Sequence, residues 1–314
     1  MAEARPSTAR RKKTAQRKTA APKAPAIKPG SILKGRFELL AEIGRGGLSH
    51  VYQARDLVAA NAGLADAMVA LKIILADRGS DPDLIALMHR EARRLRDLVH
   101  PNIVRVYDMD VEGKAHFMVM EYLEGQSLSK ALRRMEGGRL QTEQVLRLVN
   151  DLAAALTFAH SQGIVHADLK PGNVFIERTG RAKLIDFNIA YPVARPARQG
   201  EEDTVQILGR LGAVTPLYAS PQRLAGAEPC EGDDVYSLAV LTYVALTGTR
   251  PFGKKTSEEA VEQKLAPVQP EGLPRGRWNA LRRGLSLDDS ERTPSAERFA
   301  AEFTGARSFL WPLG

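Results

Sequence analysis

Two short stretches decide the fold of this chain: HADLKPGN at residues 166–173 and DFN at residues 186–188. The apolar segments 173–176 and 182–185 lie between them and predict two short strands, joined by a turn at residues 177–181. A hairpin of this length returns Asn173 and Asp186 to the same end of the two strands. Because Mg²⁺ prefers oxygen ligands, this pair predicts a site for a hard cation.

An acid, a lysine and an amide within six positions, followed by a second acid, resemble the catalytic half of the protein kinase family. The resemblance implies that Asp168 orients the attacking hydroxyl and that Lys170 neutralises the γ-phosphate of ATP. It also implies that Asn173 and Asp186 hold Mg²⁺, or Mn²⁺ in its place. The segment 169–171 is more similar to serine/threonine kinases than to tyrosine kinases. His166 is expected to be structural.

A glycine-rich loop, IGRGGLSHV at residues 43–51, lies between two predicted strands. This position argues against a dinucleotide-binding fold, where such a loop opens a helix. Glycine also marks ordinary hairpins, so the loop alone is weak evidence. The resemblance implies that Ile43, Gly44 and Gly46 contact ATP, whose phosphates the loop covers with backbone N–H groups. Ser49 stands where a third glycine is usual, and a small residue fits there.

Lys72 ends an apolar segment, and Glu91 lies on the apolar stripe of a predicted helix, four residues after Leu87 and four before Leu95. A carboxylate on a buried face needs a partner. Either residue alone is better read as a surface lysine or a snorkelling glutamate. Together and in this order they favour the kinase pair, in which the glutamate orients Lys72 onto the α- and β-phosphates.

The segment from Met120 to Leu123 resembles the hinge between the two kinase lobes, where backbone groups meet adenine. Met120 would lie at the back wall of the pocket, and Glu121 and Leu123 would supply hinge contacts. The resemblance implies that three apolar side chains enclose the base: Val51, Ala70 and Phe175. Each of these residues could equally be plain core.

Four positions depart from the family pattern. Ala167 replaces an arginine that usually clamps an activation-loop phosphate, which puts control by loop phosphorylation in doubt. Asn188 replaces a glycine, and asparagine tolerates positive φ better than most residues. Gln222 replaces a glutamate that pairs with a late arginine, here Arg292, and predicts a hydrogen bond without charge assistance. Val214 replaces a further glycine.

The charge of the chain is concentrated at its start. Residues 1–30 hold nine bases and one acid, a net charge of +8, which equals the net charge of all 314 residues. The rest of the chain is therefore neutral. Residues 1–30 contain too few large apolar side chains to offset their chain entropy and are predicted to be disordered. They fit an electrostatic tether to nucleic acid, anionic lipid or an acidic protein and equally a solvated linker.

The remaining sequence predicts an α+β fold with two lobes, because a strand-rich front precedes a helix-rich back. We expect a β-rich N-terminal lobe at residues 31–122, a mainly helical lobe at residues 123–303 and an extension at residues 304–314. Asp234 begins a segment that resembles the helix anchoring the kinase catalytic loop. One cysteine and no apolar run of roughly 18 residues fit a cytoplasmic protein without a membrane span.

The sequence therefore predicts an ATP- and Mg²⁺-dependent serine/threonine protein kinase, similar to those of bacteria, that acts on proteins and on itself. A pseudokinase that binds nucleotide and regulates a partner is the main alternative, motivated by Ala167, Asn188 and Gln222. A kinase of small-molecule hydroxyls is less favoured, because Thr215-Pro216 before Ser220-Pro221 fits a peptide platform. Phosphorylation of threonines in the basic tail would weaken its hold on an anionic partner.

Overall fold

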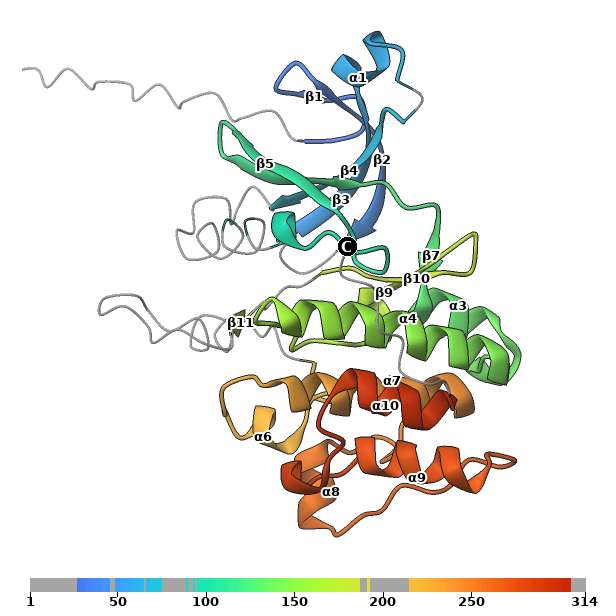
Figure 1. The fold of residues 1–314 in the computed structure, drawn as a ribbon. Helices are drawn as coiled ribbons and strands as arrows, with labels where there is room; N and C mark the ends of the chain where they lie inside the picture. Colours follow the sequence, from blue (N-terminus) through green and yellow to red (C-terminus); the bar gives the residue numbers. More distant parts are fainter. Residues whose placement is uncertain are drawn as a thin grey trace, which may run out of the picture.

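The computed structural model describes residues 27–45, 49–64, 66–74, 89, 93, 95–186, 191–192 and 215–305. A β-rich N-terminal lobe lies above a mainly helical C-terminal lobe, with a small sheet between them (Figure 1). The α+β fold with two lobes that the sequence predicts is confirmed. The disorder predicted for the basic tail concerns residues 1–30, of which 1–26 lie outside the described part.

The N-terminal lobe is a six-stranded antiparallel sheet in the spatial order β1-β2-β3-β4-β6-β5. Its strands are β1 (Ile32–Leu33), β2 (Phe37–Arg45), β3 (Ser49–Asp56), β4 (Met68–Ile74), β5 (Val106–Glu112) and β6 (Ala115–Glu121). Successive side chains of a strand point to opposite faces. On β4, Leu71 therefore joins the outer apolar cluster, and Ala70 joins an inner cluster that continues into the C-terminal lobe.

A short helix, α1 (Leu57–Asn61), follows β3. Asp56 caps it by accepting bonds from the backbone N–H groups of Val58 and Ala59 at 3.0 and 3.3 Å. The same carboxylate pairs with Arg36 at 2.6 Å, which lies 20 residues earlier. The helix thus depends on an aspartate cap that a distant arginine holds in place.

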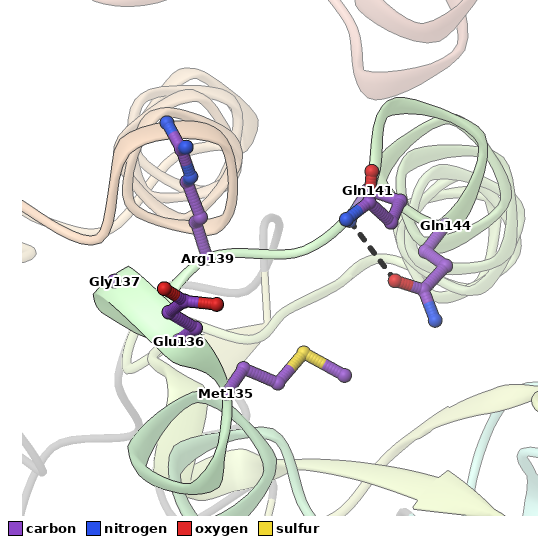
Figure 2. A pocket seen from close by; sticks show the side chains of 6 residues that line it. All are labelled: Met135, Glu136, Gly137, Arg139, Gln141 and Gln144. Atoms are coloured by element: carbon purple, nitrogen blue, oxygen red, sulfur yellow. Dashed lines mark hydrogen bonds between the residues drawn. The ribbon is translucent and has the colours of Figure 1, made fainter.

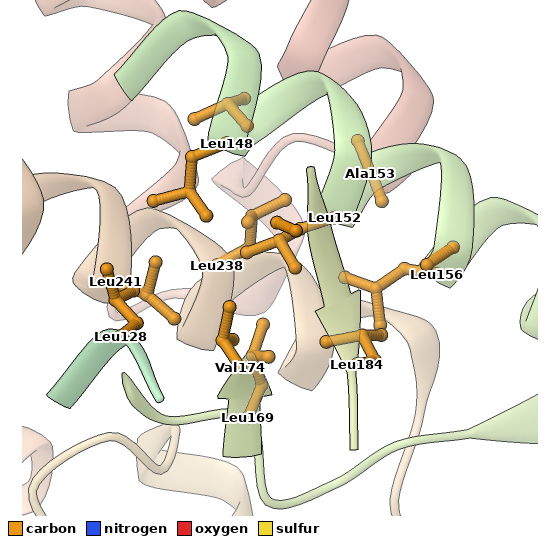
Figure 3. Close-up of a cluster of buried hydrophobic side chains, with 14 of the residues drawn as sticks. Leu128, Leu148, Leu152, Ala153, Leu156, Leu169, Val174, Leu184, Leu238 and Leu241 are labelled. Carbon is orange, nitrogen blue, oxygen red and sulfur yellow. The ribbon is translucent and has the colours of Figure 1, made fainter. Parts of the chain in front are cut away.

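The C-terminal lobe packs its helices around α7 (Glu231–Thr247), which is buried along nearly its whole length. The other α-helices in the described part of this lobe are α3 (Leu128–Arg134), α4 (Thr142–Ser161), α6 (Pro221–Leu224), α8 (Ser257–Glu262), α9 (Arg275–Gly284) and α10 (Ala296–Thr304). Leucines of α4 and α7 meet Leu169, Val174 and Leu184 in one apolar cluster (Figure 3). This cluster supports the segment that carries the predicted catalytic residues from below.

The hairpin predicted around residue 179 is confirmed as β9 (Val174–Glu177) and β10 (Ala182–Leu184). Leu184 pairs with Val174, and beyond this pair the Ile185 N–H donates to the Asn173 carbonyl at 2.9 Å. Strand β7 (Gly125–Ser127) lies beside β9 and completes a three-stranded sheet. A Cβ on Gly125 would lie 2.1 Å from a backbone oxygen of β9, so only glycine fits where the chain leaves the N-terminal lobe.

Candidate active site

An ion pair joins the two lobes at the site. Lys72 on β4 is 8% exposed, and its Nζ lies 2.9 Å from Oδ1 of Asp186, which follows β10. Burial raises the pKa of Asp186, but the charge and hydrogen bond of Lys72 outweigh burial, so the pKa lies below its ordinary value. Asp186 therefore stays ionised. Its φ of +59° is unusual for a residue other than glycine.

The predicted catalytic loop brings Asp168, Lys170 and Asn173 into direct contact. The Nζ of Lys170 lies 2.6 Å from Asp168 Oδ2 and donates to Thr215 Oγ1 at 2.7 Å. The Asn173 side chain donates from Nδ2 to the Asp168 carbonyl at 2.9 Å and to Oδ2 at 3.1 Å. Lys170 and Asn173 thus both bond to Oδ2 of Asp168, and Oδ1 forms no hydrogen bond or ion pair with the residues that the structure describes.

Asp234 anchors this loop, as the sequence predicted. Its carboxylate is fully buried and accepts bonds at 2.8 Å from the backbone N–H groups of His166 and Ala167 and from His160 Nε2. The bond to Ala167 holds that residue at φ +60°. Burial raises the pKa of Asp234, but the hydrogen bond and charge of His160 outweigh it, so the pKa is lowered.

Sequence reasoning missed His160, which lies on the buried face of α4 among apolar residues. Burial lowers the pKa of His160. Its bond to Asp234 and the charges of Asp234 and Glu231 raise the pKa by more than burial lowers it, so the net shift is upward. By contrast, burial lowers the pKa of His166 more than its acidic neighbours raise it. His166 Nδ1 accepts the Asp168 N–H at 3.3 Å, which agrees with a neutral, structural histidine.

The hinge residues lie at the end of β6. Met120 is buried and is the cross-strand partner of Ala70, and Val51 is the cross-strand partner of Lys72. The apolar residues predicted to contact adenine from the N-terminal lobe therefore lie next to Lys72. Phe175, on β9, pairs across strands with β7 and is partly exposed. Within the described part of the chain, no hydrogen bond is formed by the backbone N–H of Leu123, the hinge position predicted to face adenine.

The start of the glycine-rich loop has room to spare. Ile43 is 44% exposed, and a Cβ added to Gly44 would meet only Val51 at an ordinary 3.5 Å. The fold itself therefore does not require glycine at this position, whereas a backbone that approaches phosphates closely does. Gly46 and Glu91, the remaining predicted members of the site, lie outside the described residues, as do Asn188 and Val214.

Asn173 and Asp186 fit a divalent metal by their chemistry. Asn173 uses Nδ2 in its two bonds, so its amide oxygen remains to act as a ligand, and Asp186 has its second carboxylate oxygen. Among the residues that the structure describes, no group of three or more His, Cys, Asp or Glu side chains could hold a metal. A site with few protein ligands is typical of Mg²⁺ bound together with substrate phosphates.

Gln222 keeps the contact predicted for it and Arg292 gains a partner that the sequence analysis missed. Arg292 is 5% exposed and donates from Nη2 to Gln222 Oε1 at 2.9 Å. It also pairs through Nη1 with Asp289 at 2.8 Å. Asp289 thus supplies the negative charge that a glutamate at position 222 would have brought. Its place three residues before the buried arginine was the available signal.

A depression of about 670 Å³ lies elsewhere, between the short helix at Glu136–Gly138 and the start of α4 (Figure 2). Its lining is largely exposed, and Gln141 and Gln144 already cap α4 through the bond drawn in Figure 2. The depression shares no residue with the site described above.

Comparison with known proteins agrees with this geometry. The family profile described as protein kinase domain matches residues 37–285. The chain belongs to the protein kinase family. Two curated relatives are the serine/threonine-protein kinases PrkC of Bacillus subtilis, 33% identical over 80% of this chain and 36% of the relative, and PkaA of Streptomyces coelicolor, 35% identical over 84% and 49%.

Serine/threonine-protein kinase PknA of Mycobacterium tuberculosis is 36% identical over 71% of this chain and 49% of its own. The chain thus spans between about one third and one half of these relatives. Among solved structures, the kinase domain of Mycobacterium tuberculosis PknI has a TM-score of 0.66 at 23% identity, covering 89% of this chain and 99% of that domain. That likeness shows the bilobal kinase fold. No described helix has the length and apolar character needed to cross a membrane.

Proposed function

We propose that this kinase-family chain transfers the γ-phosphate of ATP, with Mg²⁺, to serine and threonine hydroxyls of proteins and of itself. One observation carries the proposal: an ion pair and a loop lie at the same end of the β9–β10 hairpin. The ion pair is Lys72–Asp186, and the loop carries Asp168, Lys170 and Asn173. Phosphoryl transfer requires little covalent chemistry from the protein, so positioned charges of this kind are its main catalytic means.

Each side chain has a role that its contacts allow. Lys72, oriented by Asp186 and Glu91, binds the α- and β-phosphates. Asp168 accepts a hydrogen bond from the substrate hydroxyl at Oδ1, because Oδ2 already bonds to Lys170 and Asn173. Lys170, held by Asp168 and Thr215, neutralises charge on the transferred group. Bound Mg²⁺, held by Asn173 and Asp186, would neutralise the phosphate oxygens.

ATP would bind with adenine against the hinge. The cross-strand pair of Ala70 and Met120 and the neighbouring Val51 form its roof and back wall, and Phe175 its floor. Glu121 and Leu123 would offer backbone groups to the base. Ile43, Gly44 and Gly46 would cover the nucleotide from the loop after β2, where the spare room beside Gly44 accommodates the phosphates.

Activity is proposed to be independent of a phosphate on the activation loop. Ala167 is held at φ +60° by Asp234 and has no side chain that could bind a phosphate. The catalytic loop takes its position instead from Asp234 and His166. A phosphatase-treated enzyme should therefore retain its rate, and a large fall in rate after that treatment would contradict this part of the proposal.

A pseudokinase is the second candidate, favoured by Ala167, Asn188 and Gln222. The deciding experiment incubates the purified chain with Mg²⁺, ATP and a generic basic protein, with Asp186→Ala as the control. Phosphoserine or phosphothreonine that disappears in the control supports the kinase. ATP binding without transfer would refute it in favour of the nucleotide-binding scaffold.

We propose that the basic tail of residues 1–30 binds an anionic partner, which is nucleic acid, lipid or an acidic protein. We also propose that the protein acts in the cytoplasm. The tail's net charge of +8 supports the first of these proposals. Phosphorylation at Thr8, Thr14 or Thr19 would lower that charge and weaken the contact. Peptide mapping after incubation with ATP tests this step, and an unmodified tail on an active enzyme would exclude it.

A further inference from the structure

Lys183 is a buried lysine to which the predicted catalytic machinery assigns no role. It lies in β10 between two fully buried apolar residues and is itself 8% exposed. Its Nζ lies 2.7 Å from Oε1 of Glu121, which is 62 residues earlier at the end of β6. A buried lysine is retained only with a well-placed partner, so this pair constrains where the two strands lie.

The carboxylate of Glu121 joins three segments. Besides Lys183, its Oε1 accepts the backbone N–H of Arg105 at 2.8 Å, and the Glu121 N–H donates to the Arg105 carbonyl at 2.9 Å. Glu121 thus ties the first hinge residue to the segment before β5 in the N-terminal lobe. Lys183 extends the same tie to the hairpin in the C-terminal lobe.

The hairpin also carries the floor of the adenine site. Lys183 and Phe175 are cross-strand partners on β10 and β9, so their side chains stand on the same face of the hairpin. That face turns toward the hinge, because Lys183 reaches Glu121 from it. The ion pair therefore links the residue below the base to the residue whose backbone meets its edge.

We propose that Lys183 is a positioning residue for nucleotide binding. Through Glu121 it fixes the spacing between the hinge backbone and Phe175, and so prepares the slot that adenine enters. This inference rests on the proposed ATP-binding function. It predicts that loss of Lys183 weakens binding of the adenosine part of ATP and leaves the phosphate contacts of Lys72 and Lys170 intact.

The test measures dissociation constants of Mg²⁺-ATP and of adenosine by calorimetry for wild type, Lys183→Met and Lys183→Arg. Lys183→Met should raise the Kd of both ligands by about the same factor, at least about fivefold, because the slot is no longer prepared. Lys183→Arg keeps the charge and should stay within about twofold of wild type. Lys72→Met should instead weaken ATP and spare adenosine.

Arg178→Met is the matched control. Arg178 pairs with Glu124 at 3.2 Å and joins the same hairpin to the same hinge region, but both side chains are largely exposed, at 78% and 61%. Such a pair contributes little, so this variant should bind both ligands as wild type does. The double variant Glu121→Gln with Lys183→Met should have the same Kd values as Lys183→Met alone, since both substitutions remove the same ion pair.

The outcomes separate this inference from the proposed function. Unchanged Kd values in Lys183→Met, or an equal loss in Arg178→Met, would overturn the positioning role. A loss for ATP without a loss for adenosine would also overturn it, by placing Lys183 among the phosphate contacts. A wild-type chain that binds ATP without phosphoryl transfer refutes the proposed kinase activity, and the Kd comparison still decides the role of Lys183. A wild-type chain that binds neither ligand refutes both.

Discussion

Gln222→Glu should destabilise this protein, although it restores the residue usual in the family. The new carboxylate would strengthen the bond from Arg292 by about 1 kcal/mol, since bonds to charged acceptors exceed neutral ones by roughly that amount. The gain is limited because Arg292 already pairs with Asp289 at 2.8 Å.

The loss is larger, because Gln222 also donates from Nε2 to the Leu287 carbonyl at 3.0 Å. A carboxylate has no hydrogen to donate, so this bond of about 1 kcal/mol disappears and two oxygens face each other, at a further cost of about 1–3 kcal/mol. The net effect is a destabilisation of about 1–3 kcal/mol, which corresponds to a fall in Tm of about 2–12 °C for a domain of this size.

Thermal and urea unfolding followed by circular dichroism measure this change. Gln126→Glu is the matched control, because Gln126 accepts from Arg134 at 2.8 Å in an exposed position and its side chain donates no bond to the residues that the structure describes. Its stability should change by no more than about 0.5 kcal/mol. In an Asp289→Asn background Gln222→Glu should become less harmful, since Arg292 then lacks its carboxylate. A rise in Tm for Gln222→Glu in the wild-type background would refute the reasoning.

Three further predictions concern the site and its supports. Lys72→Met and Asp168→Asn should each abolish phosphoryl transfer in a radiolabelled ATP assay, and normal rates in both would sink the kinase assignment. Asp234→Asn should reduce stability by about 2–4 kcal/mol in urea unfolding, because an amide cannot accept all three buried donors; an unchanged midpoint would contradict this. The advantage of wild type over Asp234→Asn should be largest near pH 5–6. It should shrink as pH rises through the raised pKa of His160, and also as pH falls through the lowered pKa of Asp234; equal unfolding free-energy differences at pH 5.5 and pH 9 would exclude that linkage.

Local features of the site could be predicted from the sequence because they depend on neighbouring residues. The hairpin from Val174 to Leu184 follows from two apolar runs and a turn between them, and it brings Asn173 and Ile185 together. Asp168, Lys170 and Asn173 lie within six positions of one loop, so their side chains are close in space because they are close in sequence. Such contacts need no knowledge of how distant segments pack.

The family resemblance extended prediction to pairs far apart in the chain, as with Asp234 and the catalytic loop. It did not reach interactions particular to this chain. Asp56 holding Arg36, and Asp289 supplying charge to Arg292, each depend on side chains that several elements bring together. Hydrophobic periodicity indicates which face of a strand or helix is buried, but not which polar partner lies opposite.

The sequence by itself determined which residues this protein offers for the proposed phosphoryl transfer and which of them are neighbours along the chain. The tertiary structure decided how the two lobes meet, because the pairs Lys72–Asp186 and Glu121–Lys183 span 114 and 62 residues. Each of these pairs joins a strand of the N-terminal lobe to the hairpin of the C-terminal lobe or a residue just after it, so it depends on how the two lobes are placed. Buried charges must then find partners within the packed interior, and the packing fixes which partners are within reach.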